Sequence, residues 1–220
     1  MIQVGVVLSG CGFLDGAEIY ESTLTLFFLD LAGVKVTIMA PDIDQHHVLN
    51  HLTQEPMNEV RNVLVESARL ARGQIKNMAD VSADSLDALI IPGGFGAAKN
   101  LSSLAFDGPN ATVNPDLAAL IQRIHQQKKP IGAICISPAV LSRVLSNQGI
   151  TLTIGNDPDT AQAIETMGNH HSQSQADHIV VDEANRIVST AAYMCAASIG
   201  EAGLGIERLV NQVIKMVNQS

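Results

Sequence analysis

The chain has 220 residues and a formal net charge of −9, with 46% hydrophobic and 3% aromatic residues. So acidic a chain lacks the basic patch that nucleic acids and anionic membranes bind, and it has few aromatic side chains for base stacking. Its three cysteines, Cys11, Cys135 and Cys195, are widely spaced and form no C-x-x-C motif, which argues against a disulfide framework or a zinc ribbon. We therefore expect a reducing, cytoplasmic setting without a nucleic-acid or membrane partner.

The N-terminal part of the chain has the pattern of a βαβ unit. An apolar run at residues 2–8 predicts a strand that ends in the glycine-rich turn Ser9–Gly12. Residues 17–32 predict a helix, and residues 35–40 predict the second strand. The apolar face of this helix has five residues at helical spacing: Tyr20, Leu24, Phe27, Phe28 and Leu31.

The middle of the chain begins with a longer connection than a minimal unit needs. Residues 42–52 are polar and loop-like, whereas residues 58–72 have helical spacing. Residues 86–91 predict a strand that leads at once into Pro92–Gly96. A strand followed by glycines suits a close approach of the backbone or the floor of a pocket.

The C-terminal half alternates further helices and strands. Helices are predicted at residues 116–127, 137–146, 160–167 and 194–217, and strands at residues 130–134, 150–154, 179–181 and 187–189. The last two strands flank Asp182–Asn185, which is a hairpin signal. Alternation over the whole length predicts one domain, residues 1–220, with a three-layer α/β fold and a mainly parallel sheet.

Cys135 lies where the strand at residues 130–134 turns directly into a helix, with Pro138 at a tolerated early helical position. Backbone N–H groups and the helix dipole favour an anion at such a turn. The arrangement is similar to a nucleophile elbow with Cys in place of Ser. The alternative is a buried structural cysteine, because free Cys is among the most buried residue types.

Two other loops should converge on Cys135, because ligands of parallel sheets bind at the carboxyl ends of the strands. Glu18 and Glu21 lie at the start of the first helix and could place a carboxyl group beside the thiol as a general acid or base. The backbone N–H groups of Gly94 and Ile136 could form an oxyanion hole. The simpler alternatives are that acidic residues complement a helix dipole and that glycines serve a turn.

The histidines fall in two groups, and neither has a carboxylate at ligand spacing. We interpret both groups as solvated loop residues and expect no metal site. The groups are His46, His47 and His51, and the pair His170 and His171.

Three segments resemble the active-site segments of the PfpI/ThiJ superfamily: residues 15–21 (DGAEIYE), 91–101 (IPGGFGAAKNL) and 133–139 (AICISPA). The resemblance covers nearly the whole chain and implies a flavodoxin-like fold of the class I glutamine amidotransferase type. Four further segments look like the ElbB branch, which is named for enhancing lycopene biosynthesis and described as glyoxalase-like. They are residues 7–12, 50–53, 61–64 and 153–155.

The resemblance implies roles for individual residues of this sequence. Cys135 matches the nucleophile of the superfamily, and Glu21 matches the acidic residue that hydrogen-bonds to it. Gly94 and Ile136 match the oxyanion donors, and Glu18 lies one turn before Glu21 and matches less well.

One position departs from the superfamily pattern. Many members place a His after the strand that is predicted here at residues 150–154, whereas this chain has Asn156 and Asp157. His171, in the next loop, is the candidate substitute. No H-x-E motif occurs in the chain, which argues against the glutamine hydrolysis of true amidotransferases.

The resulting hypothesis is a cofactor-free glyoxalase in which Cys135 attacks glyoxal or methylglyoxal and the product is glycolate or lactate. It requires a thiol of depressed pKa and a carboxyl group that holds a proton. Deglycation of sugar-modified proteins would share the first adduct. The alternatives are a redox sensor at Cys135 and an accessory role in isoprenoid biosynthesis. The resemblance also implies a homodimer.

Overall fold

The structure is a computed structural model, and it describes residues 1–219. The strands of its main sheet are β1 (Gln3–Val7), β2 (Lys35–Ala40), β3 (Lys76–Asn77), β4 (Ala88–Ile91), β5 (Ile131–Ile134), β8 (Val180–Asp182) and β9 (Ile187–Thr190). They lie in the order β3-β2-β1-β4-β5-β9-β8, and all pairs are parallel except β8 with β9. This confirms the predicted mainly parallel sheet and the hairpin at its end.

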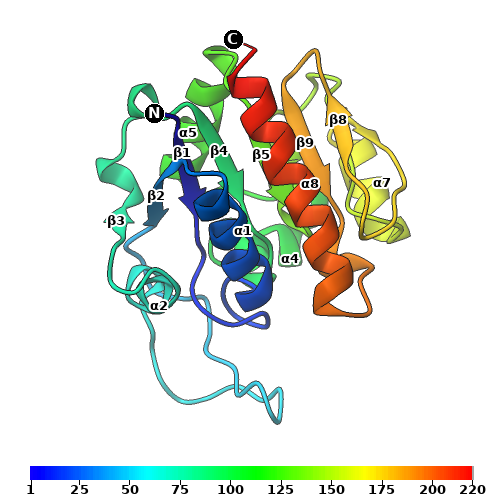
Figure 1. Cartoon of the computed structure of the whole chain (residues 1–220). Helices are drawn as coiled ribbons and strands as arrows, with labels where there is room; N and C mark the ends of the chain where they lie inside the picture. Colours follow the sequence, from blue (N-terminus) through cyan, green and yellow to red (C-terminus); the bar gives the residue numbers. More distant parts are fainter. Residues whose placement is uncertain (220) are drawn as a thin grey trace.

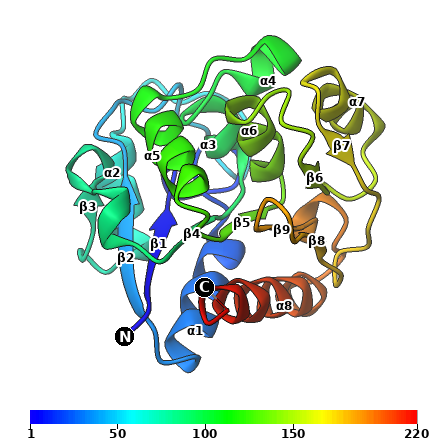
Figure 2. The same ribbon diagram turned by 90° about the horizontal axis from the view of Figure 1, so that it is seen from above.

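Helices cover both faces of the sheet (Figure 2). They are α1 (Ile19–Leu31), α2 (Val63–Leu70), α3 (Phe95–Lys99), α4 (Leu104–Asp107), α5 (Pro115–Gln126), α6 (Ser137–Val144), α7 (Pro158–Thr166) and α8 (Ile199–Val217). Four short 3₁₀ turns are η1 (Met78–Asp80), η2 (Ala83–Ser85), η3 (Gly108–Asn110) and η4 (Ala192–Met194). Helices α1 and α8 lie side by side on one face, and α5 and α6 pack on the other (Figures 1 and 2). None of the helices in residues 1–219 is long and apolar enough to span a membrane.

Strand β4 shows why the sheet is buried on both faces. Leu89 and Ile91 belong to the core under α5 and α6, whereas Ala88 and Ile90 belong to the core under α1 and α8. Alternate residues of a strand point to opposite faces, so a continuous apolar run can fill two cores. The arrangement is the predicted three-layer, flavodoxin-like fold.

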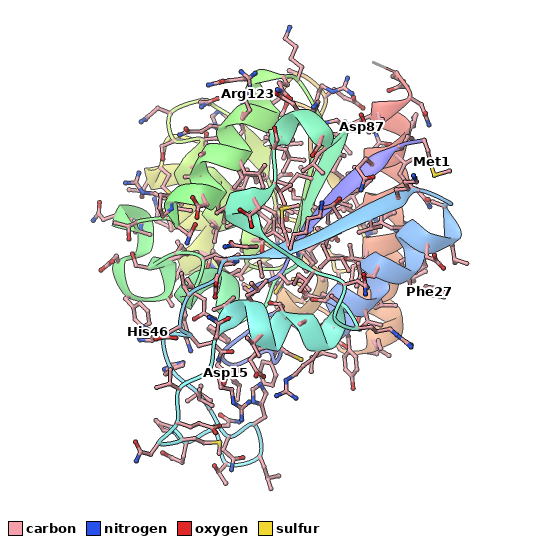
Figure 3. All side chains as sticks on the ribbon, turned by 90° about the vertical axis from the view of Figure 1, so that its left-hand side faces the viewer. Met1, Asp15, Phe27, His46, Asp87 and Arg123 are labelled. Atoms are coloured by element: carbon pink, nitrogen blue, oxygen red, sulfur yellow. The ribbon has the colours of Figure 1, made fainter. Side chains whose placement is uncertain are left out.

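The connection between β2 and α2 differs from its prediction. Helix α2 begins at Val63 rather than at residue 58, because Asn62 caps it by accepting a hydrogen bond from the Val65 N–H at 3.0 Å. Residues 42–62 instead form an irregular arm that projects from the body of the molecule (Figure 1). Asp15 and His46 lie at the end of the molecule where this arm projects (Figure 3).

The strand predicted at residues 150–154 is also different. Only β6 (Thr151–Leu152) is extended, and it pairs in parallel with β7 (His170–His171) in a separate two-stranded sheet. Thr153 instead bonds through its N–H to the Ser189 hydroxyl, at 2.9 Å. The segment therefore does not join the main sheet, and β6 instead packs against β8 and β9 at the edge of that sheet.

The apolar face predicted for α1 is not the face that is buried. Tyr20, Phe27 and Leu31 are exposed, and the buried positions carry Glu21, Ser22, Thr25 and Leu29. Small side chains on the inner face let the helix lie close to its neighbours, and this rotation brings Glu21 inward. Leu24 and Phe28 are partly buried between the two faces.

Helix α8 begins later than predicted, at Ile199, because the Ser198 hydroxyl caps it by accepting from the Glu201 N–H at 3.2 Å. The helix packs closely against its surroundings at Gly205. A Cβ atom there would lie 2.2 Å from the Ala176 carbonyl oxygen, so no side chain fits.

Candidate active site

Cys135 lies in a strained turn between β5 and α6. Its φ is +63°, a left-handed conformation that residues other than Gly, Asn and Asp seldom adopt. Its N–H donates to the Thr190 carbonyl at 2.9 Å, and the adjacent Ser137 hydroxyl donates to the Pro92 carbonyl at 2.7 Å. These bonds hold the elbow in place. Cys135 is 7% exposed as a whole residue and lines the cavity beside it.

Glu21 is the carboxyl group next to this thiol, with which it shares a hydrogen bond. It is fully buried. Its Oε2 accepts from the Gly93 N–H at 2.9 Å, and its Oε1 accepts from the Tyr193 N–H at 3.2 Å. Two backbone donors from separate loops therefore fix the carboxyl plane, so that Glu21 is held against the sulfur.

The glycines after β4 allow this close approach. A Cβ atom at Gly93 would lie 2.4 Å from the Cys135 Cβ and 2.7 Å from Glu21 Oε2. Gly94 has φ +94°, and a Cβ atom there would lie 2.3 Å from the Glu18 backbone nitrogen. The backbone N–H groups of Gly94 and Ile136 both hydrogen-bond to the Cys135 sulfur, which places the two expected oxyanion donors together.

Burial dominates the ionisation of the pair. It raises the pKa of Glu21 to about 7, assisted by the charge of Glu18 and opposed by the Tyr193 and Gly93 N–H groups. Burial and the Glu21 charge also hold the pKa of the Cys135 thiol well above its ordinary value, although the Gly94 and Ile136 N–H groups oppose this. The glyoxalase hypothesis drawn from the sequence requires a thiol of depressed pKa. The pKa of this thiol is instead raised, because no cation among the residues described faces the sulfur.

The chemistry of such a pair follows from its shared protons. Near pH 7 the buried pair holds between one and two protons, and loss of the first leaves one proton between the sulfur and the carboxyl oxygen. A carboxylate with a pKa near neutrality, already hydrogen-bonded to the thiol, is a suitable general base for it. Nucleophilicity here would come from proton transfer to Glu21 during attack rather than from a free thiolate.

The thiol opens into a cavity of about 430 Å³. Phe13, Phe95, Ile136 and Met194 form its apolar wall. Phe13 and Met194 carry no signal in the sequence, because they come from loops that only the tertiary structure brings to Cys135.

Polar groups in the cavity come from Glu18, Asp157, Thr160 and Tyr193. Glu18 also caps α1, accepting from the Glu21 N–H at 2.6 Å. It therefore both stabilises the start of the helix and lines the cavity. Burial raises the pKa of Glu18 and that of Tyr193. Thr160 lowers the pKa of Asp157 by hydrogen bonding to it. The only sequence signal for Asp157 was its position after the strand at residues 150–154.

His171 is not brought to this cavity. It belongs to β7, where its Nε2 accepts from the Ile154 N–H at 3.4 Å and its own N–H donates to Glu165 Oε1 at 2.8 Å. Burial lowers the pKa of its imidazole. These contacts support the two-stranded sheet, and Asp157 occupies the cavity instead.

Two histidines, His47 and His51, attach the arm of residues 42–62 to the body. His51 Nε2 lies 3.8 Å from the buried Asp15 Oδ1, whose second oxygen accepts from the Leu49 N–H at 2.7 Å. His47 Nε2 lies 3.3 Å from the Lys99 ammonium. Within residues 1–219 no three His, Cys, Asp or Glu side chains gather closely enough to hold a metal ion.

Comparison with known proteins agrees with this geometry. Residues 11–198 match the family model described as the DJ-1/PfpI family. The chain belongs to the DJ-1/PfpI family. The match contains all three loops that meet at Cys135.

Similar proteins cover the whole length of this family member. The rat ES1 protein homolog, mitochondrial, is 40% identical over 99% of this chain and 85% of its own length. The human glutamine amidotransferase-like class 1 domain-containing protein 3, mitochondrial, is 40% identical over 99% of this chain and 84% of its own length. A crystal structure of an isoprenoid biosynthesis protein with an amidotransferase-like domain, from Ehrlichia chaffeensis, is 38% identical with a TM-score of 0.92 and covers 98% of this chain and 99% of its own.

These comparisons contradict the predicted cytoplasmic location. Both curated relatives are named mitochondrial proteins. The prediction rested on unpaired cysteines, and these are equally compatible with other reducing compartments.

Proposed function

We propose that this protein is a glyoxalase of the ElbB type, which converts α-ketoaldehydes to α-hydroxy acids with Cys135 as nucleophile. The observation that carries the proposal is the Cys135 elbow. A positive-φ thiol, a carboxyl group of pKa about 7 and two N–H donors meet at the floor of one cavity. This combination is what addition of a thiol to a carbonyl requires.

In the first step the Cys135 sulfur bonds to the aldehyde carbon, and the thiol proton passes to the Glu21 carboxylate. The developing oxyanion is held by the Gly94 and Ile136 N–H groups and takes a proton to give a hemithioacetal. Because the carboxyl group then carries the thiol's proton, it can supply that proton to the oxyanion.

In the second step Glu21 removes the proton from the former aldehyde carbon and the neighbouring carbonyl oxygen takes up a proton, which gives an enediol. The former ketone carbon then receives the proton held by Glu21, and the hydroxyl on the former aldehyde carbon gives up its proton. The former aldehyde carbon is oxidised to a thioester, and the former ketone carbon is reduced to an alcohol. Water then breaks the carbon–sulfur bond, which releases the α-hydroxy acid and restores the thiol. The sum is α-ketoaldehyde plus water to α-hydroxy acid, so no external oxidant or reductant is needed. Deglycation would share the first adduct.

The test is turnover of methylglyoxal, followed as D- or L-lactate, by the wild-type protein and by Cys135→Ala. We expect lactate only from the protein that retains Cys135. Cys195→Ala is the matched control, because Cys195 lies outside the cavity and hydrogen-bonds to Asn156. Equal turnover by wild type and Cys135→Ala would refute the proposal.

A second candidate function is an accessory role in isoprenoid biosynthesis. Its support is the 38% identity to a protein described by that pathway. It predicts a stable complex with another protein that persists in Cys135→Ala, and methylglyoxal turnover too slow to measure. Affinity purification with both variants distinguishes it from the glyoxalase.

We also propose a homodimer formed through α1. Tyr20, Phe27 and Leu31 leave an apolar outer face on this helix, and Phe27 can be seen on it in Figure 3. Light scattering should give twice the chain mass for wild type and a monomer for Phe27→Glu. A monomeric wild-type protein would contradict the proposal.

A further inference from the structure

The cavity beside Cys135 is much larger than glyoxal or methylglyoxal. Its volume of about 430 Å³ lies in the range of roughly 300–1,000 Å³ found for pockets that enclose drug-sized ligands. Phe13 and Phe95 are 45% and 46% exposed, although aromatic rings gain most from burial. The smallest α-ketoaldehydes would leave both rings uncovered.

An apolar groove continues from this cavity. It has a volume of about 290 Å³ and shares Phe95, Ile136 and Thr160 with the cavity. Beyond this shared edge it is lined by Leu104 and Ala105, among other residues. A substrate bound at Cys135 could therefore extend an apolar substituent over Ile136 into the groove.

Apart from Cys135 and Tyr193, the ionisable side chains that line the two spaces are carboxylic acids. Glu18 and Asp157 line the cavity and Asp159 lines the groove, whereas no Lys, Arg or His among residues 1–219 lines either. The Lys99 ammonium lies 4.6 Å from the centroid of the Phe95 ring, but it donates to the Leu14 carbonyl at 3.1 Å. An anionic substituent would lose its water, meet like charges and find no cationic partner.

We propose that the site selects α-ketoaldehydes that carry an aryl or branched apolar group and no negative charge, and that Asp157 is a specificity-determining residue. This inference rests on the proposed function for the reaction, but its argument uses only the shape and charge of the cavity and groove. The bonds that form and break, and the redox balance, are the same as for methylglyoxal, because the substituent takes no part in the reaction.

A binding measurement tests the occupant separately from catalysis. Methyl 4-acetylbenzoate and 4-acetylbenzoate are aryl ketones without the reactive aldehyde, and they differ in one negative charge. Calorimetry with the wild-type protein should give a Kd at least about tenfold lower for the ester. In Asp157→Asn the ratio of the two Kd values should fall several-fold.

A separate substitution tests whether the ligand enters the groove. Ala105 is exposed and lines the groove, so Ala105→Trp should fill it and weaken binding of the ester. Ala184→Trp, at an exposed alanine in the turn between β8 and β9, is the matched control. Equal effects of the two variants would remove the groove from the proposal.

Turnover completes the test. We expect kcat/KM for phenylglyoxal to exceed that for methylglyoxal by about tenfold or more, because only the aryl group covers the apolar wall. Turnover of both without preference, or binding of the two ketones with equal Kd, would overturn the selectivity while leaving the glyoxalase standing. If the site binds the ester selectively but turns over neither α-ketoaldehyde, the glyoxalase proposal is refuted and the preference for uncharged aryl ligands stands.

Discussion

Two cysteines of this protein lie in similar places and differ in what surrounds them. Cys135 follows β5 and Cys11 follows β1, so both lie past the carboxyl ends of parallel strands. Each thiol also has a buried glutamate nearby, Glu21 for Cys135 and Glu66 for Cys11. Burial raises the pKa of both thiols.

The two glutamates differ in their partners. Glu66 accepts from Arg69 Nε at 2.8 Å and from Arg69 Nη2 at 3.2 Å, and Arg61 Nη1 lies 3.7 Å away. Glu21 is bonded only to backbone N–H groups and the thiol among the contacts described. Glu66 is thus paired with guanidinium groups, whereas Glu21 has no cationic partner among the residues described and can exchange a proton near neutral pH. What distinguishes the Cys135 site is therefore a carboxyl group without a cationic partner, and not the thiol alone.

The largest expected effect is removal of the Cys135 sulfur, with removal of the Cys11 sulfur as the comparison. Cys135→Ala should lower kcat/KM for methylglyoxal by about 10⁴-fold or more, because removal of a nucleophile disables the whole catalytic unit. Cys11→Ala should change it by less than about twofold, because Cys11 is not in the cavity. Steady-state kinetics on the two variants checks both values, and comparable losses would erase the distinction between the two sites.

The two glutamates give the next largest difference. Glu21→Gln keeps the shape of the side chain but removes the general base, so kcat should fall by about 10²–10³-fold. Glu66→Gln should instead lower the melting temperature, since it leaves Arg69 without its carboxylate, and should leave kcat nearly unchanged. A Glu21→Gln variant with wild-type kcat would show that the base lies elsewhere.

Glu21 should also make stability depend on pH. Its folded-state pKa of about 7 is raised above its ordinary value of 4.5, so the folded protein holds this proton when the unfolded chain has lost it. Its contribution is full below about pH 4.5 and falls by about 3 kcal/mol as the pH rises to about 7. Urea unfolding of wild type and Glu21→Gln across this range should show the variant gaining relative stability with pH, and parallel curves would contradict the shifted carboxyl group.

The smallest effect is expected at the loop that follows β1. Asp15→Ala removes the acceptor of the Leu49 N–H, which should cost about 1–2 kcal/mol of unfolding free energy. Chemical denaturation measures this loss. The kcat of folded protein should change by no more than a few-fold, because Asp15 holds the arm and does not line the cavity; a loss as large as that of Glu21→Gln would make the arm part of the active site.

Much of the fold could be predicted because its signals are local. Strand β2 has the bounds that its apolar run predicts, and α5 buries Leu117, Leu120, Ile121 and Ile124 as their spacing indicates. The elbow was also predictable, because a strand, a cysteine and an early helical proline are adjacent in the chain.

What failed depends on packing at a distance. The face of α1 follows from the requirement that Glu21 reach Cys135 and that Ser22 face inward, and neither is encoded in apolar spacing. Tyr193 meets Glu21 through a turn at residues 192–194, where Ala192 has φ +40°. His171 has the chemistry of the expected residue, but the pairing of β7 with β6 holds it in the small sheet.

The most direct test of the Cys135–Glu21 pair is the pH dependence of alkylation at each cysteine, followed by peptide mass spectrometry in wild type and Glu21→Gln. We predict that the rate at Cys135 rises through about pH 7 in wild type, because loss of the first proton from the pair makes the sulfur nucleophilic. In Glu21→Gln this rise should disappear, and the Cys11 profile should be the same in both proteins. A Cys135 rate that titrates at the same pH in both proteins would contradict the account.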